Sequence, residues 1–127
     1  MRLDPFVSFA GCAFSLQRGD VVQRWGAPSR AGRNEVGLNE LDYGDVVLRF
    51  QDGGRLEEIT AQAPVLHLGP VAIPFENLQP FIAGQDARAF WRARFLISPA
   101  LGLAFAPTEP AWITALARHC LPEWEAL

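Results

Sequence analysis

Two cysteines and two histidines supply the side chains with which this chain could perform nucleophilic or metal chemistry. They are Cys12, Cys120, His67 and His119, and His119 and Cys120 are neighbours in the sequence. A thiol and an imidazole act as a catalytic dyad only when the fold places them in hydrogen-bond contact. Since consecutive residues on a strand point to opposite faces, we predict no catalytic residue and no enzymatic activity.

The spacing of these four residues also differs from that of structural zinc sites. Such sites commonly pair their ligands as Cys-x-x-Cys or His-x-x-x-His, and this chain contains neither pattern. The glycine pair in Asp52-Gly53-Gly54 lies between two expected strands, so it indicates a hairpin turn and not a phosphate-binding loop. We therefore predict no metal ion and no cofactor.

Acidic side chains are concentrated in the middle of the chain, where seven acids and only two arginines lie between Glu35 and Glu58. Glu57 and Glu58 would face opposite sides of a strand, so they would not act as a paired acid and base. Such acids can instead attract a basic partner. The predicted partner-binding residues are four acids and two tryptophans: Asp42, Asp45, Glu57, Glu58, Trp112 and Trp124. The alternative is an ordinary solvated sheet face with both tryptophans in the core.

The size and composition of the chain indicate one folded domain. It has 127 residues, half of them hydrophobic, and we predict a single domain over 1–127 with weakly separated halves, 1–63 and 64–127. The chain has eleven arginines and no lysine, which excludes Schiff-base lysine chemistry. The net charge of −3 and the scattered arginines argue against nucleic-acid binding.

The stretch Phe9-Ala10-Gly11-Cys12 is similar to the cleavage box of a lipoprotein signal. Only eleven residues precede Cys12, and Asp4-Pro5 interrupts them, whereas a signal needs about 7 to 15 consecutive apolar residues. No apolar run approaches the length of a transmembrane helix. We therefore expect no lipid anchor, no membrane association and a cytoplasmic location, with both cysteines reduced. A disulfide between Cys12 and Cys120 is the alternative.

In the first half we expect a strand, a helix and a hairpin. Residues 6–10 form a short apolar run typical of an opening strand. Ser15 is the expected N-cap of a helix that ends at Trp25, because Gly26 favours a left-handed C-terminal cap. The segment 30–39 is expected to be a loop or an irregular strand start.

The hairpin is the clearest element of the sequence. Residues 45–51 alternate apolar and polar side chains in strand fashion, and residues 55–63 should form the returning strand. Leu56 and Ile59 have opposite parity along that strand, which indicates a β-bulge.

In the second half we expect helices over 75–82 and 87–94, the first strained by Pro80. Residues 95–97 and 101–105 should form a second hairpin around Ser98-Pro99. Residues 111–120 are compatible with either helix or strand.

A faint internal repeat accompanies these elements. A strand ending in LRF at Phe50 and a strand ending in LAF at Phe105 each follow a helix that ends in glycine. This indicates two pseudo-repeated αβ units. We therefore predict an α+β fold, with an antiparallel sheet of short strands and two to four helices.

The first half resembles the αβ unit of the BamE/SmpA family over residues 14–61. The resemblance is carried by Val21, Gly26, Pro28, Tyr43, Phe50, Gly54 and Leu56. The β-lactamase inhibitor proteins, built from two such units, are similar in plan. The C-terminal SPALGLAF and the closing Trp124 are similar to patterns in small immunity proteins of bacterial polymorphic-toxin systems.

These resemblances and the acidic segment together predict a protein-binding module. Its most concrete form is a bacterial immunity protein that neutralises a cognate toxin by occluding the toxin's active cleft. A BamE-like envelope or scaffold module without its lipid anchor is one alternative. A small-molecule-binding protein or enzyme is another, and a homodimer is compatible with each.

Overall fold

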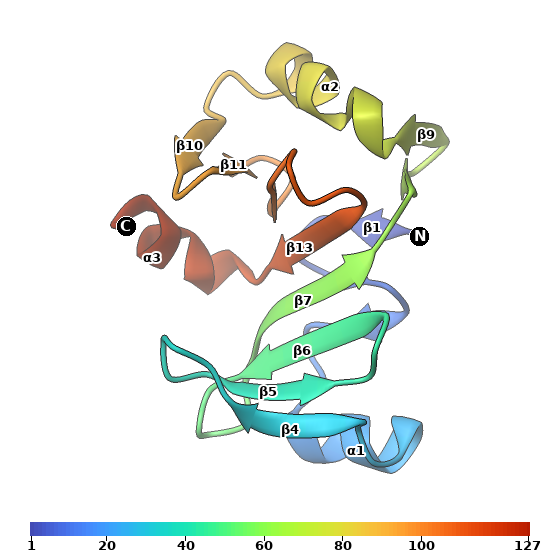
Figure 1. Ribbon diagram of the computed structural model, residues 1–127, viewed down its shortest axis with the longest axis vertical. Helices are drawn as coiled ribbons and strands as arrows, with labels where there is room; N and C mark the ends of the chain where they lie inside the picture. The colour runs from blue at the N-terminus through green and yellow to red at the C-terminus, as the bar shows by residue number, and fades with distance from the viewer.

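The computed structural model describes residues 1–127 and is organised around an eight-stranded antiparallel sheet (Figure 1). The strand order is β10-β11-β12-β13-β7-β6-β5-β4. The first half of the chain contributes β4 (Arg30–Arg33), β5 (Asn39–Asp42), β6 (Val46–Phe50) and β7 (Leu56–Gln62). The second half contributes β10 (Phe90–Arg92), β11 (Phe95–Ser98), β12 (Leu103–Phe105) and β13 (Trp112–Leu116). The predicted α+β fold with an antiparallel sheet is confirmed.

Each half of the chain contributes a helix followed by four consecutive strands. Helix α1 (Arg18–Trp25) precedes β4 to β7, and α2 (Leu78–Gln85) precedes β10 to β13. The last strands of the two halves, β7 and β13, pair at the centre of the sheet. Phe50 ends the third sheet strand of the first half and Phe105 the third of the second. The predicted repeat is therefore present in the order of the elements, although α2 ends at Gln85 before Asp86 and not at a glycine.

The N-cap of helix α1 lies two residues after the predicted one. Its N-cap is Gln17, whose backbone N–H donates to Asp20 Oδ2 at 3.0 Å, so the prediction of Ser15 was wrong. Asp20 decides the start because its carboxylate satisfies a backbone donor that the first turn leaves free. The helix ends at Trp25 as predicted, and Gly26 follows with a positive φ of 80°, although its ψ of −165° lies outside the left-handed helical region.

The chain before α1 forms three short strands instead of one. They are β1 (Leu3–Asp4), β2 (Ser8–Phe9) and β3 (Cys12–Ala13), and Phe6 turns the chain between the first two with φ 64°. Cys12 is fully buried in the main core, and its thiol and that of Cys120 are both free. Cys12 is thus a core residue. None of the helices combines the length and apolar character needed to cross a membrane.

The second half departs further from prediction. After the hairpin of β8 (Val65–Leu68) and β9 (Val71–Pro74), a short 3-10 turn, η1 (Phe75–Asn77), leads into α2. Pro80 is the third residue of α2, where the missing N–H has no helical partner, so it does not strain the helix. The ambiguous segment 111–120 forms β13 and a second 3-10 turn, η2 (Arg118–Cys120), before α3 (Leu121–Glu125).

The predicted helix over 87–94 is instead a turn and strand β10, and Asp86 explains the difference. Its buried carboxylate accepts hydrogen bonds from Ser98 Oγ at 2.7 Å, from the Arg88 N–H at 2.9 Å and from the Ala100 N–H at 3.1 Å. These bonds hold the chain after α2 against the β11–β12 turn. Burial acts to raise the pKa of Asp86, but the hydrogen bonds outweigh it and the pKa is lowered.

The two faces of the sheet carry different side chains. Leu48 and Ile59 face the main core. Arg49, Glu58 and Thr60 face the other side, where they form a polar strip. Beyond the polar strip, that second face carries a small apolar cluster under α3, formed by Ile97, Ala104 and Leu116 with Phe90, Phe95, Leu121 and Trp124 packed against it. Figure 1 shows α1 beside β4, and α2 at the opposite end of the molecule.

Candidate functional site

The six predicted partner-binding residues do not form one surface. Asp42 ends β5 and pairs with Arg30 at 3.5 Å, and Asp45 is exposed in the turn before β6. Trp112 begins β13 opposite Gln62, whose N–H donates to the Asp45 carbonyl. These three predicted residues therefore lie at one end of the central strands.

Glu58 and Trp124 lie at the other end of those strands and contact each other. The indole N–H of Trp124 donates to Glu58 Oε2 at 3.2 Å. Burial raises the pKa of Glu58, while Arg49 and the Trp124 N–H act in the opposite direction. The fold thus joins one predicted acid and one predicted tryptophan across 66 residues of sequence.

The prediction that Glu57 is a surface contact was wrong, because its exposed fraction is only 1%. The β-bulge explains its position: Phe50 pairs with Leu56 and Arg49 with Glu58, so Glu57 is the extra residue between them. The bulge indicated by the parity of Leu56 and Ile59 is therefore present. Glu57 and Glu58 also have separate surroundings, as expected.

A groove of about 800 Å³ runs across the polar strip of the sheet. Its walls are the β4–β5 loop, which includes Glu35 and Val36, and α3 with Glu123 and Trp124. Figure 1 shows this loop and α3 at the left of the view, toward the same end of the strands. The exposed fractions of Val36 and Leu127, 74% and 68%, place apolar side chains at the rim.

Both arginines of the groove form ion pairs with acidic side chains of the same chain. Arg49 Nε contacts Glu40 Oε2 at 2.7 Å, and its Nη1 contacts Glu58 Oε1 at 3.3 Å. Arg33 pairs with Asp52 at 2.9 Å. Glu35 and Glu123 form no ion pair, so the groove presents uncompensated negative charge.

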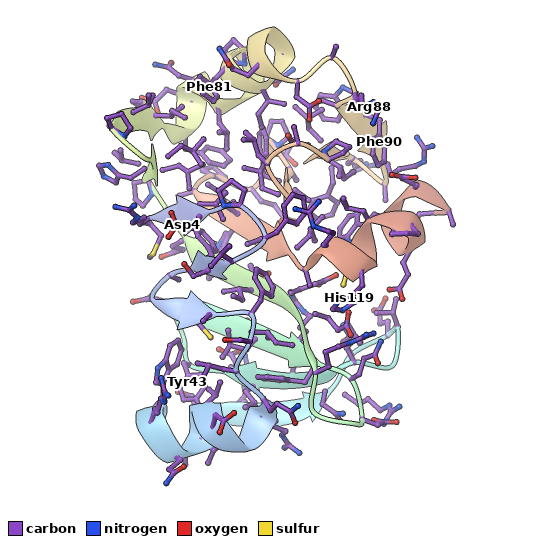
Figure 2. The ribbon with its side chains drawn as sticks, turned by 180° about the vertical axis from the view of Figure 1, so that it is seen from behind. Asp4, Tyr43, Phe81, Arg88, Phe90 and His119 are labelled. Atoms are coloured by element: carbon purple, nitrogen blue, oxygen red, sulfur yellow. The ribbon has the colours of Figure 1, made fainter.

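A second cluster lies where η2 crosses the start of β7. Glu57 Oε2 contacts His119 Nε2 at 2.5 Å and accepts from Cys120 Sγ at 2.6 Å. Arg55 Nε donates to the other carboxylate oxygen, Oε1, at 3.0 Å. Figure 2 labels His119 where η2 passes beside the strands. Glu57 and Cys120 are buried, and the His119 side chain is 33% exposed.

The carboxylate, and not the imidazole, is the centre of this cluster. In a catalytic dyad the imidazole takes the proton of the thiol, but here Cys120 donates to Glu57. Burial, followed by the Glu57 hydrogen bond and charge, raises the pKa of Cys120 above its ordinary value. A raised pKa disfavours the thiolate nucleophile. His67 is exposed in β8 and is not part of the cluster.

Sequence reasoning missed the meeting of Glu57, His119 and Cys120. It assumed that His119 and Cys120 point apart on a strand, but both belong to the 3-10 turn η2 and both reach Glu57. The bulge was the one local signal, because an extra residue can redirect its side chain. No local pattern places η2 beside β7.

Comparison of the chain with protein-family models, with curated proteins and with solved structures finds no match. The resemblances to BamE/SmpA and to immunity proteins stay predictions from the sequence. The proposed function therefore depends on the geometry and charge of the groove.

Proposed function

We propose that this protein acts by binding another protein, and that a basic segment of the partner occupies the groove between the β4–β5 loop and α3. The observation that carries this proposal is the charge of the groove. Glu35 and Glu123 are free on opposite walls, while Arg33 and Arg49 are neutralised internally. Negative charge in a concave site attracts and orients basic side chains.

Both walls of the groove are held in place before a partner binds. In the loop, Asn34 Oδ1 accepts from the Leu38 N–H at 2.8 Å and from the Val36 N–H at 3.2 Å. On α3, Trp124 packs edge-on against Phe95 with ring centroids 5.6 Å apart. A preformed site loses less conformational entropy on binding, which favours affinity.

The most concrete form of the proposal is an immunity protein whose toxin partner has a basic active cleft. Clefts that bind nucleic acid are basic because they neutralise phosphates, so an acidic protein surface can occlude them. The two-unit architecture supports this version, since it agrees with the plan that the resemblance to β-lactamase inhibitor proteins implies.

The test is capture of the tagged protein and of a charge-reversed variant from the native host, followed by mass spectrometry. The double variant E35R/E123R reverses both free acids of the groove. The matched control, E76R/E109R, changes net charge equally at two exposed acids outside it. We expect a stoichiometric partner with wild type and control that is lost with E35R/E123R. Equal recovery with all three proteins would contradict the proposal.

Two alternatives from the sequence predict different outcomes of the same experiment. A BamE-like envelope or scaffold module would be recovered in the membrane fraction together with envelope proteins. A small-molecule-binding protein or enzyme would be recovered without a protein partner and with a bound metabolite. A homodimer would be recognised by co-elution of tagged and untagged copies.

A further inference from the structure

Three different metal-ligating atoms converge at the start of β7. The Oε2 atom of Glu57, the Nε2 atom of His119 and the Sγ atom of Cys120 all lie within 4.8 Å of one another. They come from two segments about 60 residues apart, brought together by the β-bulge and by η2. The cluster lies outside the set of residues that line the groove.

We propose that Glu57, His119 and Cys120 bind one zinc ion, a property that goes beyond the proposed protein-binding function. The donor set selects this metal. A thiolate disfavours the hard cations Mg²⁺ and Ca²⁺, while zinc accepts sulfur, nitrogen and oxygen together in a tetrahedral site. Three protein ligands leave one position for water, and the partial exposure of His119 gives solvent a route to it.

The charge of the proposed site balances in a buried position. A zinc ion with one thiolate and one carboxylate carries no net charge, and the neutral imidazole adds none. Binding transfers the Cys120 thiol proton to solvent and replaces the S–H···O contact with a Zn–S bond. Burying a neutral cluster avoids the free-energy cost of burying an unpaired ion.

The geometry requires a small opening of the cluster. The contacts from Glu57 Oε2 to His119 Nε2 and Cys120 Sγ are 2.5 and 2.6 Å. Zn–N and Zn–O bonds of about 2.0 Å and a Zn–S bond of about 2.3 Å place tetrahedral ligand atoms roughly 3.3 to 3.5 Å apart. Each of the two contacts must therefore lengthen by about 0.8 to 0.9 Å. His119 can move away from Glu57, because its side chain is one third exposed on a short turn, while the Glu57–Cys120 contact opens by a shift of those two buried side chains.

Arg55 provides the support that zinc-ligating carboxylates commonly have. Its Nε donates to Glu57 Oε1, the oxygen that faces neither His119 nor Cys120, at 3.0 Å. Hydrogen bonds of this kind orient a ligand, and their loss typically lowers metal affinity about 10–100-fold. Arg55 is thus a positioning residue for the site.

The experiment is titration of the chelator-treated full chain with Zn²⁺ by calorimetry, together with Co²⁺ as a spectroscopic probe. Cys120→Ala and Cys12→Ala are a matched pair, because both remove a buried thiol and only Cys120 contacts Glu57. We expect one zinc per chain in wild type and C12A. Affinity should fall by more than about 100-fold in C120A and H119A, and about 10–100-fold in R55A.

The cobalt spectrum identifies the ligands directly. Wild type and C12A should show a thiolate-to-cobalt charge-transfer band that C120A lacks. The partly exposed His119 makes H119A a variant that retains the fold, which circular dichroism checks. The proposal is overturned if wild type shows no saturable zinc binding, or if zinc affinity is unchanged in both C120A and H119A. The groove variant E35R, which leaves Glu123 near Cys120 unchanged, should bind zinc normally, so this test is separate from that of the protein partner.

Discussion

The hydroxyl groups of Thr60 and Thr114 lie 2.8 Å apart at the centre of the sheet, where the last strands of the two halves meet. Thr114 is the middle residue of β13 and pairs with Thr60 of β7. Arg49 Nη1 also donates to Thr60 Oγ1 at 2.7 Å, so this contact connects the junction of the halves with the floor of the groove. Removing this hydrogen bond should therefore lower the stability of the whole sheet.

Replacing Thr114 with Val should lower the free energy of unfolding by about 1 kcal/mol, because one partly buried hydrogen bond is lost while the shape of the side chain is kept. Urea denaturation followed by circular dichroism measures this. In T60V/T114V the loss should exceed the T114V value, since Arg49 then also loses an acceptor. A single unfolding transition is expected in every case, because β7 and β13 join the halves into one sheet. Separate transitions for the two halves would contradict this.

Asp86 should make stability depend on acid pH. Its pKa in the folded state is below its ordinary value of 3.8, so the stabilisation is present above that value and is lost as pH falls through the folded pKa. The variant D86N should be less stable by about 1–3 kcal/mol at pH 7, because a buried charge-assisted set of hydrogen bonds is weakened. Thermal unfolding between pH 7 and pH 2 should show a smaller acid-induced loss in D86N than in wild type.

Gly102 should not tolerate a side chain. It has φ 63°, and a Cβ atom there would lie 2.7 Å from the ring of Phe6. That ring also stacks under the guanidinium of Arg118 in η2, 4.0 Å from the ring centroid. We expect G102A to lose about 1–3 kcal/mol of stability through backbone strain and displacement of Phe6. Gly53 is the control, because its Cβ would meet no atom within 4 Å and its φ is not positive; G53A should leave the denaturation midpoint nearly unchanged.

Removing Arg49 should leave two acids of the groove unpaired. In R49M, Glu40 and Glu58 lose their shared cation, and we expect the free energy of unfolding to fall by about 1–3 kcal/mol at pH 7 because charged hydrogen bonds are broken.

The same variant should change how stability depends on pH. The pKa of Glu58 is already raised by burial, and the charge of Arg49 is the largest influence that lowers it. Its pKa should therefore rise further in R49M. Because a raised folded pKa favours the protonated form, R49M should regain stability as pH falls from 7 toward 5. A stability difference from wild type that is constant over this range would contradict the assignment.

Local patterns were sufficient where neighbouring residues alone determine the conformation. The alternation of β6, the glycine that ends α1 and the hairpin at Asp52-Gly53-Gly54 each depend on a few consecutive residues. The bulge in β7 was also visible, because the parity of Leu56 and Ile59 can only be reconciled with one buried face by an extra residue. Each of these elements is present in the structure.

Local patterns failed where a distant contact outweighed the local preference. Residues 87–94 have helix-forming alanines and arginines. Asp86 nevertheless holds this segment to Ser98 and Ala100 by hydrogen bonds, and Trp91 of β10 pairs with Leu96 of β11. Ser15 was displaced as the helix cap by the reciprocal contact of Gln17 and Asp20. The acidic residues could be counted, but which of them are exposed depended on strand register.

The sequence by itself determined an α+β fold with an antiparallel sheet, since the periodicity of apolar residues and the turn residues specify elements such as α1, β6 and β7 locally. Only the tertiary structure decided which acids act together. Pairing of β7 with β13 and the crossing of η2 place Glu57 beside His119 and Cys120, while Glu58 joins Trp124 in the groove. These residues are more than 60 positions apart, and contacts of that range arise from sheet pairing and core packing, which no local pattern encodes.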